Sequence, residues 1–94
     1  MSTLITLKEY CIQYDIEPAF LIELEDSGII YYQVAGEEKY IQEEQFEELE
    51  RYIRFYYDLN INIEGIDAIR HLLQRVHDME REIKSLRNQL RLHE

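Results

Sequence analysis

The sequence predicts one small, mainly α-helical domain with a β-hairpin and a long C-terminal helix, and three observations lead to this prediction. The chain has 94 residues, which is too short for two independent hydrophobic cores or for a multidomain enzyme. Hydrophobic residues make up 46% of it, enough to fold despite a formal net charge of −10. Apolar residues recur with helical spacing along most of the chain, and one stretch around Gly36 is instead β-branched and aromatic.

Two short helices are expected at the N-terminal end. Thr6 followed by Glu9 forms a capping box, and apolar residues at i, i+3, i+4 and i+7 predict a helix over residues 7–14. Pro18 suits the first turn of a second helix, and Gly28 is suited to end it in a left-handed conformation. Because only about three residues separate the two helices, they form a helix-turn-helix.

A two-stranded β-hairpin is expected next. Residues 29–34 and 39–41 are rich in β-branched and aromatic side chains, and they flank the turn sequence Ala35-Gly36-Glu37-Glu38. A hairpin that follows a helix-turn-helix would form a wing beside it. This wing would be acidic, because its two glutamates face only one basic residue, Lys39.

Two further helices are expected after the hairpin. From Glu43 to about Asp58 the apolar residues keep a 3.6-residue period, which predicts a third helix. The sequence Asn60-Ile61-Asn62 interrupts that period. Asn62 is a suitable N-cap for a last helix that runs almost to Glu94.

The C-terminal segment, residues 62–94, follows a domain of residues 1–61 and carries a heptad pattern typical of a coiled coil. Its a and d positions form an apolar seam that predicts a homodimer: Ile69, Val76, Ile83 and Leu90 at a, and Leu72, Met79 and Leu86 at d. Arg75 can meet the partner's Glu80 in a parallel dimer or the partner's Glu82 in an antiparallel one, so the direction stays open. A helix that folds back on its own domain is the alternative.

Charge divides the chain into unlike halves. Residues 1–50 carry 2 basic and 13 acidic side chains, whereas residues 51–94 carry 8 basic and 7 acidic ones. The acidic half would be repelled by polyanions, so neither nucleic acid nor an acidic membrane is an expected partner. The single cysteine, Cys11, cannot form an internal disulfide and lies on an apolar stripe, which favours a core role and a cytoplasmic protein. We expect neither a secretion leader nor a membrane span.

No catalytic, metal or cofactor site is expected, so the protein is predicted not to be an enzyme. His71, His77 and His93 are not spaced to share one helix face. The acid pairs at 43–44 and 47–48 would lie on the polar side of a helix, whereas a catalytic acid needs burial. The sequence also lacks a glycine-rich phosphate loop and a nucleophile motif.

The order of these elements resembles the MerR-type winged helix-turn-helix proteins. Residues 16–30 keep three residues of the family pattern, which are Leu21, Glu25 and Gly28. Where DNA-reading members carry Arg and then Tyr on the second helix, this chain has Ile22 and Glu23. The resemblance therefore implies a MerR-like fold whose phosphate and base contacts are gone.

A second motif resembles the signature of one branch of these proteins. Residues 58–69 are similar to the Asp-Leu-Gly-Val-Asn-Leu-x-Gly-Val signature of the chaperone modulator CbpM family, a MerR-like branch that does not act on DNA, with Asn60 where Gly is common. This resemblance implies a protein that binds the J-domain of a CbpA/DnaJ-like co-chaperone and inhibits its action with DnaK.

The charge of the domain is consistent with such a partner. J-domains present a basic helical surface, which attracts an acidic protein and which that protein can then occupy. We expect the apolar centre of the contact at Ile22 and its charged rim at Glu23, Asp26, Glu37 and Glu38. For the wing glutamates, a solvated turn is an equally good explanation.

Two other functions stay open. A MerR-like DNA-binding transcriptional regulator would use Arg51, Arg54 and Arg70 to reach phosphates. A stand-alone oligomerisation module would depend on residues 69–94 and would not depend on Glu23.

Overall fold

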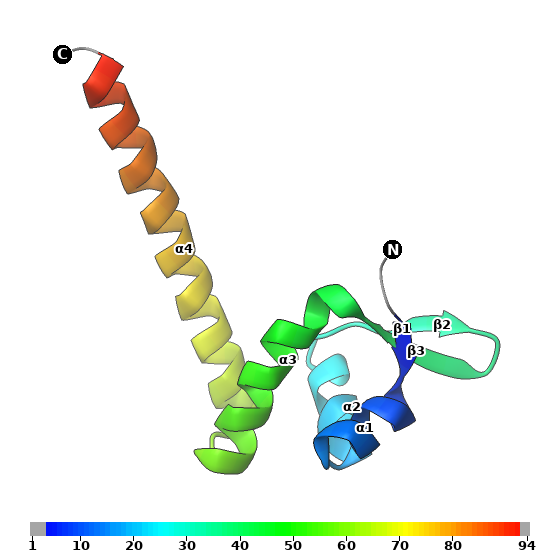
Figure 1. The fold of residues 1–94 in the computed structure, drawn as a ribbon. Coiled ribbons are helices and arrows are strands. Elements are labelled where there is room, and N and C mark those ends of the chain that lie inside the picture. Colours follow the sequence, from blue (N-terminus) through cyan, green and yellow to red (C-terminus); the bar gives the residue numbers. More distant parts are fainter. Residues whose placement is uncertain (1–3, 93–94) are drawn as a thin grey trace.

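A computed structural model describes residues 4–92, and its first two helices form the predicted helix-turn-helix (Figure 1). Helix α1 spans Leu7–Tyr14 and helix α2 spans Pro18–Asp26. The backbone N–H of Glu9 donates to Thr6 Oγ1 at 3.1 Å, which satisfies one of the free donors of the first turn of α1. Helix α1 therefore begins where its capping box places it.

The wing is present, but its first strand is shorter than predicted. Strand β2 spans Gln33–Ala35 and strand β3 spans Glu38–Gln42, and they are paired antiparallel around a two-residue turn. The prediction of strand structure from residue 29 is wrong, because Ile29 and Ile30 are both buried in the core. Consecutive residues of a strand point to opposite faces, so burial of both indicates a segment that turns into the core.

A third strand, which the sequence did not predict, completes the sheet. Strand β1 spans Leu4–Thr6 and pairs antiparallel with β3, with Ile5 opposite Ile41, so the strand order is β1-β3-β2. The sheet thus joins the chain just before α1 to the inner strand of the wing. This pairing fixes the wing to the start of the helix-turn-helix.

The predicted third helix has three parts. It starts as a short 3₁₀ turn, η1 (Glu43–Gln45), continues as α3 (Phe46–Ile53) and closes with one turn of π-helix, η2 (Arg54–Asp58). Gln45 is buried and holds the segment between α2 and β2 in place. Its side chain accepts a hydrogen bond from the backbone N–H of Tyr31 at 3.0 Å and donates one to the backbone carbonyl of Tyr31 at 2.9 Å. The helix ends at Asp58, as its apolar period predicts.

Helix α4 spans Ile63–Leu92, 30 residues, and Asn62 caps it as predicted, because Asn62 Oδ1 accepts from the Gly65 N–H at 2.8 Å. The last two residues of the predicted helix lie outside the described residues. Figure 1 shows α4 projecting clear of the domain, so within its described length it does not fold back. Within residues 4–92, no helix combines the length and the apolar character that crossing a lipid bilayer requires.

Within residues 4–92, the core joins the helix-turn-helix, strand β3, the third helix and the start of α4. Its fully buried side chains come from both helices of the helix-turn-helix, the sheet, α3 and the start of α4: Tyr10, Leu21, Leu24, Ile41, Leu49 and Ile66. Cys11 is buried among them, and burial raises the pKa of its thiol, so it is a poor nucleophile. The fold class is thus confirmed as mainly helical, with a winged helix-turn-helix and a long C-terminal helix.

Gly65 provides a test of the junction at which α4 leaves the domain. A Cβ atom at this position would lie 2.7 Å from Ile61 Cγ2 and 3.1 Å from Asn62 Oδ1. Ile61 is β-branched and its methyl group has little freedom to move away. We therefore expect Gly65→Ala to lower the free energy of unfolding by about 1 kcal/mol or more, although alanine is the better helix former.

Urea unfolding followed by circular dichroism measures this effect. The matched control is Ser85→Ala, a change to alanine at an exposed position in the distal half of α4, which should leave stability equal or slightly higher. Equal stability of the Gly65→Ala protein would show that the junction can relax around a methyl group.

Candidate partner-binding surface

The exposed face of α2 carries the residues that the sequence singled out for partner binding. Ala19, Ile22, Glu23 and Asp26 lie at i, i+3, i+4 and i+7, and all four are exposed. The opposite face of α2 is apolar and buried through Phe20, Leu21 and Leu24. The outer face is thus a small apolar area followed by two carboxylates, with no basic residue anywhere on α2.

An aromatic cluster holds α2 in place against the end of the third helix. The ring of Phe20 lies 4.4 Å from that of Tyr56 and 5.5 Å from that of Tyr57, measured between ring centroids. The hydroxyl of Tyr57 also accepts a hydrogen bond from the backbone N–H of Glu17 at 3.0 Å. These contacts fix the first turn of α2, and its last turn lies beside the first turn of α4, because both turns line one hollow.

The result is an acidic concavity between α2 and α4, which we define by Glu23, Asp26 and Glu64. Ser27, Tyr56, Asn62 and Ile63 complete its lining. Glu64 was not predicted to contribute, because nothing in the sequence shows that the first turn of α4 lies beside the last turn of α2. A carboxylate at that position is favourable for α4 itself, since the first turn of a helix attracts negative charge. Three carboxylates around one hollow suit a lysine or arginine side chain of a partner.

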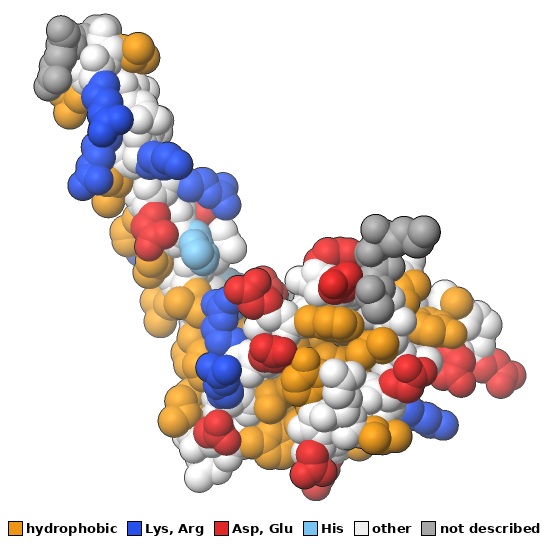
Figure 2. Space-filling model, viewed as in Figure 1, with side chains coloured by type: hydrophobic (Ala, Val, Ile, Leu, Met, Phe, Trp, Pro, Cys, Tyr) orange, Lys and Arg blue, Asp and Glu red, His pale blue; other side chains and the backbone are white. Residues whose placement is uncertain are grey.

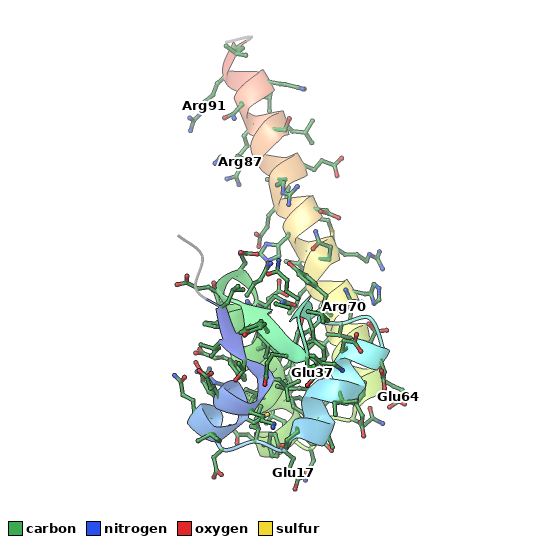
Figure 3. The ribbon with its side chains drawn as sticks, turned by 90° about the vertical axis from the view of Figure 1, so that its right-hand side faces the viewer. Glu17, Glu37, Glu64, Arg70, Arg87 and Arg91 are labelled. Atoms are coloured by element: carbon green, nitrogen blue, oxygen red, sulfur yellow. The ribbon has the colours of Figure 1, made fainter. Side chains whose placement is uncertain are left out.

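The two wing glutamates lie elsewhere. Glu37 is in the hairpin turn after Gly36, whose φ is +66°, and Glu38 begins β3. The wing projects away from α4 in Figure 1, and Figure 3 shows Glu37 and Glu64 on different elements. The structure therefore does not bring Glu37 and Glu38 into the acidic concavity. Within the wing, the ammonium group of Lys39 lies 5.3 Å from the centroid of the Tyr32 ring.

Two of the three arginines considered for DNA contact line a different hollow from the acidic concavity. Arg51 and Arg70 line a hollow between α3 and α4 together with Glu48, and no residue of α2 or of the wing lines it. The guanidinium group of Arg70 is paired with Asp67 at 2.8 Å. Arg54 is exposed in the π-helical turn. Arg51 and Arg70 thus lie in a hollow that α2, the helix expected to enter a DNA groove, does not line.

The heptad seam of α4 is exposed along most of its length. Six of its seven residues are between 46% and 64% exposed, and they are Leu72, Val76, Met79, Ile83, Leu86 and Leu90. The seventh, Ile69, is half-buried near the domain. The face of α4 that packs on its own domain is a different one, which includes Ile63 and Ile66. Figure 2 shows basic side chains on the distal part of α4 and acidic ones over the domain.

His71 and His77 contact their own helix. His71 Nδ1 lies 2.9 Å from the carbonyl oxygen of Asp67, and His77 Nδ1 lies 3.8 Å from Glu80 Oε2. His93 lies outside the described residues. In the described part of the chain, no three His, Cys, Asp or Glu side chains are grouped as a metal site would need.

Comparison with known protein families gives a match. A family model described as MerR HTH family regulatory protein matches residues 5–88, which include the whole winged helix-turn-helix and most of α4. No curated protein and no solved structure matches the chain. The family model therefore agrees with the observed order of helices and strands and covers the candidate partner-binding surface.

Proposed function

The chain belongs to the MerR HTH family of regulatory proteins, and from this premise we propose that it binds a co-chaperone instead of a promoter. Its partner is the J-domain of a CbpA/DnaJ-like co-chaperone, and binding inhibits the action of that co-chaperone with DnaK. The observation that carries the proposal is the exposed face of α2, where Ile22 is followed by Glu23 and Asp26 and no basic side chain is present.

Electrostatics favour a cationic protein over DNA. A helix that enters a DNA groove needs lysine or arginine for the phosphates and suitable donors for the base edges. Here α2 offers carboxylates, and the wing turn offers Glu37 and Glu38 beside Lys39 alone. Each carboxylate is repelled by phosphate and attracted to the basic helical surface of a J-domain.

The mechanism that follows is competition by occupancy. Ile22 supplies a desolvated apolar contact, and the acidic concavity receives a lysine or arginine of the J-domain. While the complex lasts, that basic surface is not free for DnaK. Charges at the rim of such an interface mainly raise the association rate, so the affinity should fall as salt rises. The protein needs no cofactor or catalytic residue for this role.

DNA binding is the second candidate, because the matching family model is itself described by a DNA-binding motif. Such a regulator would use Arg51, Arg54 and Arg70. These residues lie on the third helix and on α4, so the phosphate contacts would not come from α2.

One experiment separates the two candidates. Binding of the purified protein to an isolated CbpA-type J-domain is measured by calorimetry at low and at high salt, and gel shifts are run with random and promoter DNA. We expect a saturable J-domain complex that weakens with salt, and no DNA complex. If the folded protein fails to bind the J-domain at low salt, the proposal is wrong; a selective DNA shift would then favour the second candidate.

We further propose that the working form is a homodimer joined through the α4 seam. An exposed apolar stripe of about three heptads is unfavourable in water, and a second copy provides a stripe of matching length. Its own domain cannot cover the seam, because the domain packs on a different face of α4. The dimer would carry two J-domain sites.

A further inference from the structure

A second hollow, on the other flank of α2, is mostly apolar. It lies between α1 and α2, and its lining residues are Lys8, Cys11, Ile12, Asp15, Ile16 and Pro18. Cys11 and Ile16 are buried and form its floor. Ile12 is 81% exposed, so no described segment of the chain covers this side chain. We call this hollow the α1–α2 groove.

The groove is continuous with the exposed face of α2. Pro18, at the start of α2, lies one helical turn before Ile22, so the two side chains share a face. Glu23 lies on the opposite flank of that face, where the acidic concavity begins. The outer side of α2 therefore has an apolar hollow on one flank and an acidic hollow on the other.

The surrounding charge indicates what fills the groove. Residues 7–26, which form α1, the turn and α2, carry six acidic side chains and one basic one. An anionic or strongly acidic partner would be repelled from this surface, whereas a cationic polypeptide is attracted to it. An apolar groove within such a field suits a helix that has an apolar side chain among lysines and arginines.

We infer that the α1–α2 groove is the apolar anchor site for the cationic J-domain helix. An aliphatic or aromatic side chain of that helix enters the groove beside Ile12, while its basic side chains reach Glu23 and Asp26 across α2. This inference rests on the proposed function and adds to it the direction in which the partner crosses α2. Desolvated contacts of this kind, at the centre of an interface, often carry most of its affinity.

The test compares two exposed apolar residues. Ile12→Ser removes the side chain at the groove, and Val34→Ser removes one that is 66% exposed on the wing, outside the groove. We expect Ile12→Ser to weaken binding to the isolated J-domain about tenfold or more at both low and high salt, because an apolar contact is not screened. Val34→Ser should bind like the unaltered protein, and circular dichroism should show both variants folded.

The outcomes keep the inference and the proposed function apart. If the unaltered protein binds the J-domain and Ile12→Ser binds equally well, the groove is not the anchor and the proposed function stands. Equal losses in both variants would also overturn the inference, because the wing would then contribute as much as the groove. If the unaltered protein does not bind the J-domain, the proposed function itself is wrong.

Discussion

Val76→Asp is expected to convert the protein from a dimer into a monomer. Val76 lies in the middle of the α4 seam at a heptad a position and is 46% exposed in the single chain. In a dimer of either direction this side chain would lie in an apolar layer, where an unpaired carboxylate costs several kcal/mol. We expect the dimer dissociation constant to rise by about two orders of magnitude or more. Sedimentation velocity over a range of protein concentrations measures it.

Asn88→Asp is the matched control for this prediction. It adds the same charge to α4 at an exposed position of heptad f, opposite the seam. We expect this variant to remain dimeric. We also expect the Val76→Asp monomer to keep a folded domain, because Val76 is not part of its core. A Val76→Asp protein that still sediments as a dimer would contradict the assignment of the seam as the interface.

Helix ends were predictable because their signals are local. The capping box of Thr6 and Glu9, the proline at the start of α2 and the Asn62 cap each act within one turn of backbone. Gly28 was predictable for the same reason, since its φ of +74° is a conformation that glycine adopts readily. The starts of α1, α2 and α4 therefore follow from residues close by in the sequence.

The sheet was predicted less well because strand pairing depends on residues far apart in the chain. Strand β1 has only three residues, and its partner Ile41 is 36 positions from Ile5 in the sequence, a separation that no local pattern reveals. Ile29 and Ile30 are β-branched, so they resemble strand residues. Both are buried because the chain turns back into the core after α2, and this turn depends on tertiary packing, not on local sequence.

The same distinction applies to the candidate site. Helical spacing was enough to place Ile22, Glu23 and Asp26 on one exposed face of α2, because that depends only on the period of the helix. The contribution of Glu64 and the distance of Glu37 from the acidic concavity depend on how α4 and the wing pack. Composition showed that the surface is acidic, but the packing decides which of its acids can act together.

The double substitution Glu23→Lys with Asp26→Lys is expected to weaken J-domain binding about tenfold to a hundredfold at low salt. It replaces two of the three carboxylates of the acidic concavity by ammonium groups that repel a basic partner. Both side chains are exposed, so the fold should persist. The loss should shrink as salt rises, because exposed charges are screened. Calorimetry across a salt series measures both effects.

Glu44→Lys with Glu47→Lys makes the same change in net charge at exposed positions in η1 and α3, which do not line the acidic concavity. If binding depends on the concavity, this control loses much less affinity than the Glu23 and Asp26 pair. Equal losses would mean that the overall charge of the domain only attracts the J-domain and that the contact lies elsewhere. Comparison of the two pairs therefore separates a defined contact from long-range attraction, which the net charge alone cannot do.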